Sequence, residues 1–172
     1  MIQSDNTNSN SAGFEQYVYG MRLALQEAER AYEEGEIPVG AIVLLQGKII
    51  GRGHNQVERL KDPTAHAEII AITAAAAHQS SKWLYEADLF VTKEPCAMCA
   101  GAIVHARVKN LIFGASDEKA GACGSIMNIV QHPKLNHRVN IVKGIEEAKC
   151  ASLLQSFFEK LRKNEKEGLS NV

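Results

Sequence analysis

Apolar residues recur at helical spacing near both ends of the chain. Residues 14–34 carry apolar side chains at this spacing and stop before Gly35, which suits a helix C-cap. Residues 146–163 show the same spacing, with one apolar face formed by Leu153, Leu154, Phe157, Phe158 and Leu161. Both segments are therefore predicted to be amphipathic helices.

The region between these helices is predicted to contain a mixed sheet. Two apolar runs flank Gln46-Gly47-Lys48, which predicts a β-hairpin. Strands are expected at 87–92, 110–115 and 138–144, and helices at 65–79, 95–107 and, within a long loop, near 125–131. Because strands and helices alternate from residue 87, part of the sheet is parallel, whereas the hairpin is antiparallel. The predicted fold is a three-layer α/β/α domain with about five strands.

Length and composition agree with one globular domain. The chain has 172 residues, of which 45% are hydrophobic and 23% are charged. Residues 1–13, rich in Asn and Ser, are expected to form a disordered tail. The folded domain is predicted to span 14–163, and 164–172 are expected to form a flexible C-terminal tail.

The charge balance excludes a uniformly basic surface for nucleic acid. Twenty acidic and nineteen basic residues give a net charge of −1. The charges are unevenly distributed, since residues 1–37 hold seven acids and two bases, whereas 134–166 hold eight bases and four acids. The C-terminal third is therefore a candidate phosphate-binding surface, the alternative being a solvated helix face.

The sequence also predicts a cytoplasmic protein that does not enter membranes. No apolar run approaches the roughly 18 residues that a membrane span needs. The first 13 residues are polar and lack the apolar stretch of a signal peptide. The four cysteines are too few for a disulfide scaffold, and two of them form a C-x-x-C motif. This usage indicates a reducing compartment and thiols that bind metal or act in redox chemistry.

Two short motifs at predicted helix starts form the candidate catalytic site. His66-Ala67-Glu68 opens one helix, and Pro95-Cys96-Ala97-Met98-Cys99 opens another. The strand between them brings both helix starts to the same end of the sheet. One imidazole and two thiolates suit Zn²⁺, and three protein ligands leave a fourth position for water, which is typical of catalytic zinc. Glu68 is expected to point away from the metal and to move protons to and from that water.

Less specific interpretations of these residues remain open from the sequence alone. A C-x-x-C motif also occurs in redox sites and structural zinc sites, and Cys123 or His105 could supply the fourth ligand of a closed site. Otherwise Cys123 and Cys150 suit small buried apolar positions. Asn55, which follows the hairpin, suits a turn residue when it is considered by itself.

These motifs resemble the cytidine-deaminase-like superfamily of zinc deaminases, whose signature is H-x-E followed by P-C-x-x-C. Within that superfamily the chain is similar to the bacterial tRNA-specific adenosine deaminases over about residues 14–163. Lys93 departs from the family pattern, which usually has leucine there. The segments that carry the similarity are EIPVGAI (36–42), GHN (53–55), DPTAHAEI (62–69), EPCAMCAGAIVHAR (94–107), FGASDEKAGACGS (113–125), LNHRV (135–139) and the pair Phe157-Phe158.

The resemblance implies a specific set of site residues. His66, Cys96 and Cys99 would hold one Zn²⁺ per subunit, Glu68 would shuttle protons, and Asn55 would contact the target adenine. It also implies a homodimer whose substrate tRNA touches both subunits. The reaction would be hydrolytic deamination of adenosine to inosine at the wobble position of the anticodon loop.

Two other functions are compatible with the same metal motif. The first is deamination of a free base or nucleotide, of the guanine or cytosine type. The second is a zinc-stabilised RNA-binding module without catalysis, against which Glu68 argues, because a structural zinc site needs no carboxylate beside an open metal position.

Overall fold

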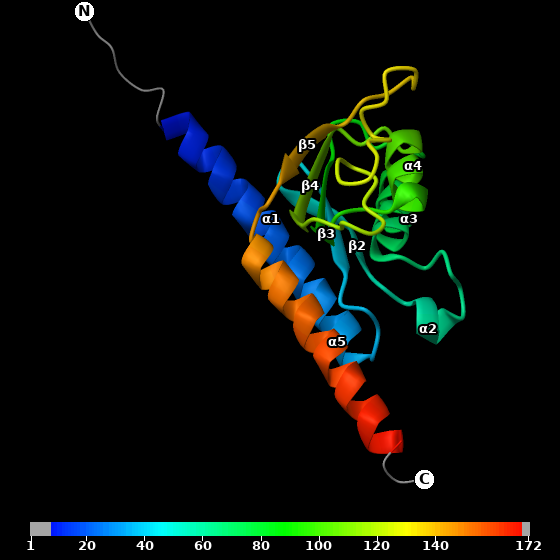
Figure 1. The fold of residues 1–172 in the computed structure, drawn as a ribbon. Coiled ribbons are helices and arrows are strands. Elements are labelled where there is room, and N and C mark those ends of the chain that lie inside the picture. The colour runs from blue at the N-terminus through cyan, green and yellow to red at the C-terminus, as the bar shows by residue number, and fades with distance from the viewer. Residues whose placement is uncertain (1–7, 170–172) are drawn as a thin grey trace, which may run out of the picture.

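A computed structural model describes residues 8–169, which form a central five-stranded sheet with helices on both faces (Figure 1). In chain order the elements are α1 (Asn8–Glu33), β1 (Gly40–Leu45), β2 (Lys48–His54), α2 (Val57–Leu60), α3 (Ala67–Gln79), β3 (Asp88–Lys93), α4 (Ala97–His105), β4 (Asn110–Ala115), β5 (Asn140–Lys143) and α5 (Glu147–Leu169). The predicted mixed α/β fold is confirmed.

The sheet combines antiparallel and parallel pairs as the sequence predicts. Its strand order is β2-β1-β3-β4-β5. The hairpin β1-β2 and the pair β1-β3 are antiparallel, whereas β3-β4 and β4-β5 are parallel. Gln46 and Gly47 both have positive φ, of 51° and 75°. These values are typical of the tight turn whose twist matches the strands of a two-residue hairpin.

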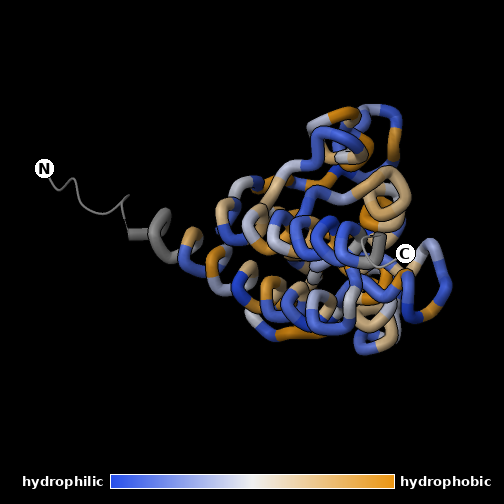
Figure 2. Tube along the Cα trace, turned by 60° about the horizontal axis from the view of Figure 1, so that its bottom comes forward, coloured by the Kyte–Doolittle hydropathy of each residue, from blue (hydrophilic) through white to orange (hydrophobic). Residues whose placement is uncertain are grey.

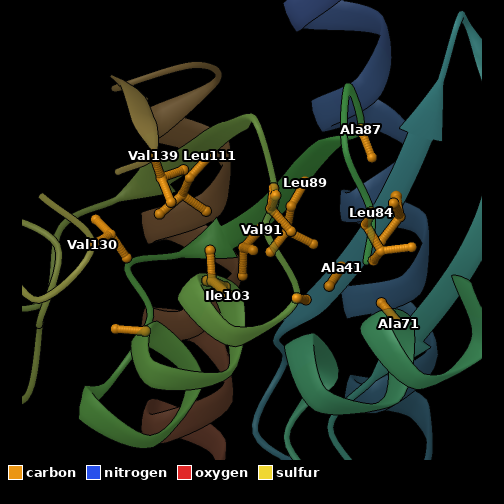
Figure 3. Packing of buried hydrophobic residues seen from close by; sticks show 14 of the residues in the cluster. Ala41, Ala71, Leu84, Ala87, Leu89, Val91, Ile103, Leu111, Val130 and Val139 are labelled. Carbon is orange, nitrogen blue, oxygen red and sulfur yellow. The ribbon is translucent and has the colours of Figure 1, made fainter. Parts of the chain in front are cut away.

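Each face of the sheet buries its own apolar cluster. Helices α3 and α4 cover one face, where Leu89, Val91, Ile103 and Leu111 pack together (Figure 3). Helices α1 and α5 cover the other, around Phe90. Along α1, which follows the labelled N-terminus in Figure 2, hydrophilic and hydrophobic residues are interspersed, as expected for a helix with one face on a sheet and one in solvent.

A close contact between β2 and α3 fixes the start of α3. A Cβ at Gly53 would lie 2.3 Å from the carbonyl oxygen of Ala67, and one at Gly51 would lie 2.3 Å from that of Ala71. Only glycine leaves room for such an approach of two backbones. The alanine face of α3 therefore rests directly on β2, which brings the first turn of α3 beside the residues that follow β2.

Three local predictions differ from the structure. Helix α1 begins at Asn8, so 8–13 are helical and not disordered, while 1–7 lie outside the described residues. Helix α5 extends to Leu169, so most of the predicted flexible tail 164–172 is helical, and 170–172 are not described. Adding residues to a helix that is already packed costs little, because nucleation is the expensive step. The helix predicted near 125–131 is absent from the described residues, where turns replace it.

Candidate metal centre and catalytic cavity

The two motifs lie at adjacent helix starts, at the end of the sheet where β3 ends. His66 is the N-cap of α3 and Cys96 is the N-cap of α4, and both have extended backbone conformations. Cys99 lies one turn into α4 and is fully buried. Partial positive charge at a helix N-terminus favours anionic groups, which here are the thiolates.

The spacing of the three donor atoms fits a tetrahedral metal ion. Nδ1 of His66 lies 3.7 Å from Sγ of Cys96 and 3.5 Å from Sγ of Cys99. All three donors lie within 4.8 Å of one another. Usual zinc–nitrogen and zinc–sulfur bond lengths at a tetrahedral angle give a nitrogen–sulfur separation of about 3.6 Å. His66, Cys96 and Cys99 can therefore hold a metal together.

Hydrogen bonding shifts the pKa values of the two cysteine thiols in opposite directions. Hydrogen bonds from Cys99 and from the His66 ring lower the pKa of Cys96 to about 3. The same contact with Cys96, together with burial, raises the pKa of Cys99. The pKa of His66 is raised, chiefly by its hydrogen bond to Cys96. These hydrogen bonds therefore favour the thiolate form of Cys96, which is the form that binds a metal.

The alternative fourth ligands do not join this group in the described part of the chain. Cys123 is buried, and its Sγ contacts the carbonyl oxygen of Pro95 at 3.9 Å. His105 is exposed in the last turn of α4. Cys150 is buried against the opposite face of the sheet, as expected for a small apolar residue. A three-ligand group leaves one position of a tetrahedral metal for a small molecule.

A cavity of about 260 Å³ opens beside the His66-Cys96-Cys99 group. Glu68, His66, Cys96 and Asn55 all line it. Glu68 lies in the first turn of α3, retains 4% exposure, and has a pKa raised chiefly by burial. The volume of the cavity is smaller than that of most ligand pockets, which is about 300–1,000 Å³, so the cavity suits a small ligand or one small part of a larger ligand.

A buried carboxylate that the sequence reasoning missed holds Asn55 in place. Oε2 of Glu36 accepts from Nδ2 of Asn55 at 3.2 Å and from the backbone N–H of Glu58 at 3.2 Å, and its Oε1 accepts from the backbone N–H of Arg59 at 2.7 Å. Because a carboxylate only accepts, the amide of Asn55 must turn its NH₂ towards Glu36. Asn55 is therefore not a simple turn residue, since its side chain is locked in one orientation.

The orientation of Asn55 leaves an acceptor for the cavity. Its Oδ1 has no hydrogen-bond partner among the described residues. In that part of the chain, every fully buried side-chain nitrogen or oxygen has a partner. Oδ1 must therefore retain accessible surface, and the cavity is the space that Asn55 lines.

A second missed carboxylate orders the loop that closes the cavity. Glu94 accepts from the backbone N–H groups of Asp117, Cys123 and Ser125 at 3.0 Å, and from the Ser125 hydroxyl. Gly124 in this loop has φ of 142°. These bonds hold the loop in an irregular path, which explains why no helix forms near residue 125. Only one indication of this role is present in the sequence, namely that Glu94 lies directly before Pro95 and Cys96.

Comparison with known proteins gives consistent matches. The family model of MafB19-like deaminases matches residues 16–162. The tRNA-specific adenosine deaminase of Aquifex aeolicus (strain VF5) is 50% identical over 147 residues, which cover 85% of this chain and 96% of that protein. The one from Bacillus subtilis (strain 168) is 42% identical over 152 residues, covering 88% and 94%.

A solved structure agrees with the sequence matches. It comes from biochemical and structural studies of A-to-I editing by tRNA:A34 deaminases at the wobble position of transfer RNA. The two chains superpose with a TM-score of 0.76 at 41% identity, and the match covers 78% of this chain and 98% of the other. With its fold, its His-Cys-Cys group and these relatives, the chain belongs to the tRNA-specific adenosine deaminases, within the cytidine-deaminase-like fold.

Proposed function

We propose that this protein removes the amino group of adenosine at the wobble position of a tRNA anticodon loop, giving inosine and ammonia. The observation that carries the proposal is the placement of Glu68 and Asn55 in the cavity beside His66, Cys96 and Cys99. The relatives named as tRNA-specific adenosine deaminases support the substrate.

We assign His66, Cys96 and Cys99 as ligands of one Zn²⁺ per subunit. Nitrogen and sulfur donors with this spacing fit tetrahedral zinc. Zinc bound there would act as a Lewis acid that lowers the pKa of a water molecule. The two cysteines, as thiolates, would balance the charge of the ion and leave the site close to neutral.

Glu68 is the group placed to move protons. It is buried in the cavity two residues after His66, and it is not one of the three clustered donors. Its carboxylate takes a proton from the attacking water and transfers it to N1 of adenine as the C6–O bond forms. The second water proton follows through Glu68 to the amino group, the C6–N6 bond breaks, and ammonia leaves.

Asn55 is the group placed to recognise the base edge. Its Oδ1 is free to accept a hydrogen bond, and Glu36 prevents the amide from turning. On the edge of the adenine base, the exocyclic amino group is the hydrogen-bond donor that suits this acceptor. A base in an anticodon loop is already unpaired, so moving it into the cavity costs little.

The basic end of α5 is a candidate contact for the tRNA backbone. The ring of Phe157 lies 5.7 Å from that of Tyr32 at the end of α1, and Nζ of Lys160 lies 5.3 Å from the same Tyr32 ring. Arg162 and Lys163, one turn further, are exposed. These contacts bring the basic segment beside Tyr32, which lies four residues before Glu36 of the cavity.

A homodimer in the cytoplasm remains part of this proposal. Ile126, Met127 and Leu135 expose apolar side chains on the loop that follows β4, which suits a surface between two copies. None of the helices in residues 8–169 has the length and apolar character needed to cross a membrane.

The experiment that tests this function is incubation of the metal-loaded protein with a panel of anticodon stem-loops and free nucleobases. Products are scored for inosine, uracil and xanthine. Inosine at the wobble position of the stem-loop is the expected result, with no uracil or xanthine from the free nucleobases. Turnover of free guanine or cytosine, with stem-loop adenosine unchanged, would assign the free-base activity. Binding of the stem-loop with no product from any substrate would assign a non-catalytic module.

A further inference from the structure

Lys93 places a cation at the cavity at a position where the sequence resemblance leads one to expect leucine. It is the last residue of β3, and it pairs in register with Ala115 of β4. Its side chain is 33% exposed and lines the cavity together with His66 and Cys96. The end of β3 therefore places an ammonium group at the cavity, on a residue that lies three positions before Cys96.

The lining of this cavity is strongly acidic. Glu36, Glu58, Glu68, Glu94 and Asp117 also line the cavity. Lys93 is the one lysine or arginine that lines it in the described part of the chain. An RNA strand whose target base enters this cavity brings its phosphates towards these carboxylates, and Lys93 is the lining group whose charge attracts them.

The ammonium of Lys93 is held in one orientation, and protein partners do not satisfy all of its N–H donors. Its Nζ donates to Oδ2 of Asp117. Oδ1 of Asp117 accepts from the backbone N–H of Lys119, and Asp117's own N–H donates to Glu94, so this carboxylate is itself held firmly. A lysine ammonium has three donors. The other two N–H groups of Lys93 have no protein partner within residues 8–169.

We propose that Lys93 binds a backbone phosphate adjacent to the target nucleotide and so favours an adenosine within RNA over a free base or nucleoside. This inference rests on the proposed function, because it assumes an RNA substrate. Asp117 holds the ammonium in position before substrate arrives, which reduces the entropy lost on binding. Lys93 is thus a specificity-determining contact outside the proton-transfer chemistry.

The test compares Lys93→Met, which removes the charge at similar length, with Lys93→Arg, which keeps it. Lys119→Met is the matched control, because Lys119 is an exposed lysine two residues after Asp117, the ion-pair partner of Lys93. The metal-loaded proteins are assayed on an anticodon stem-loop and on free adenosine over a range of KCl concentrations. The Tm of each variant is measured alongside.

Lys93→Met is expected to lower kcat/KM for the stem-loop by about tenfold or more, as loss of a charge-assisted contact does. The slope of log kcat/KM against log salt becomes shallower by about 1. Turnover of free adenosine changes less than about twofold, Lys93→Arg retains most of the activity, and Lys119→Met is close to wild type.

A substrate series locates the phosphate. Stem-loops carrying one uncharged methylphosphonate at a time beside the target are tested with wild type and Lys93→Met. One substitution is expected to harm the wild type and to have little further effect in Lys93→Met, which gives a non-additive cycle. Additive effects at every phosphate with an unchanged salt slope, or an equal loss on stem-loop and free adenosine with lowered Tm, would overturn the proposal in favour of an internal ion pair. Failure of the wild type to edit any stem-loop would instead overturn the proposed function.

Discussion

The orientation of Asn55 is predicted to depend on Glu36, and a charge swap between these two residues tests this. Asn55→Asp replaces the 3.2 Å hydrogen bond from Nδ2 to Oε2 with two carboxylate oxygens in contact. Glu36 is almost fully buried and Asn55 nearly so, so solvent screens this repulsion poorly. Adding Glu36→Gln restores a donor–acceptor pair in the opposite sense, because the new amide NH₂ can donate to the carboxylate introduced at position 55.

The magnitudes follow from the bonds that are lost and regained. An unpaired buried charge costs about 3–5 kcal/mol, so Asn55→Asp should lower the free energy of unfolding by about that amount. The double variant regains a hydrogen bond to a charged group, about 1.5–3 kcal/mol, but leaves the backbone N–H of Glu58 without its acceptor. The double variant removes the penalty of about 3–5 kcal/mol and adds about 1–3 kcal/mol for the unpaired N–H, so it should recover about 2 kcal/mol of the loss.

Activity should follow the same cycle, because the carboxylate at position 55 of the double variant still presents an acceptor oxygen to the cavity. Asn55→Asp should lower kcat/KM by about a hundredfold, and the double variant should recover about tenfold. Denaturant unfolding and stem-loop turnover are measured for both single variants, the double variant and Glu58→Gln. The last is a matched control, because it removes a carboxylate whose side chain is 75% exposed. Additivity within about 0.5 kcal/mol would show that Glu36 does not act through Asn55.

The metal site, the proton shuttle and the β2–α3 contact give three further predictions. Cys96→Ala should lose metal and activity together, measured by metal analysis and inosine formation, and an active metal-free variant would contradict the ligand assignment. Glu68→Gln should keep metal content and Tm while kcat falls by about a hundredfold or more, and substantial residual turnover would assign proton transfer elsewhere. Gly53→Ala should lower the free energy of unfolding by about 1–3 kcal/mol, because its Cβ would lie 2.3 Å from a backbone oxygen of α3. Gly101→Ala, a helical position where the added Cβ meets nothing within 4 Å outside its own stretch of helix, is the control and should not destabilise. Equal effects at both glycines would refute the steric argument.

The clustering of His66, Cys96 and Cys99 could be predicted from the sequence because their placement depends on local signals. Each motif opens a helix, and the single strand between them determines that both helices start at the same end of the sheet. The hairpin was equally accessible, since Gln46 and Gly47 form a two-residue turn between two apolar runs. In both cases, neighbouring residues determine the geometry.

The supporting carboxylates could not be predicted, because their partners lie far away in the chain. Glu36 accepts from groups 19 to 23 residues later, and Glu94 accepts from groups 23 to 31 residues later. A glutamate in a sequence window gives no sign that it will be buried and fully hydrogen-bonded. The same long-range bonds explain why the helix predicted near residue 125 is wrong: Glu94 takes the backbone N–H groups of Cys123 and Ser125.

Deamination of a stem-loop in water enriched with heavy oxygen tests the central claim most directly. An anticodon stem-loop with adenosine at the wobble position is incubated with the metal-loaded protein, digested to nucleosides and analysed by mass spectrometry. Inosine is expected at that one position, with its new oxygen taken from the labelled water and with no product from Glu68→Gln. Unchanged adenosine, inosine at other positions, or inosine without the label would contradict hydrolytic editing of a single extruded base in this cavity.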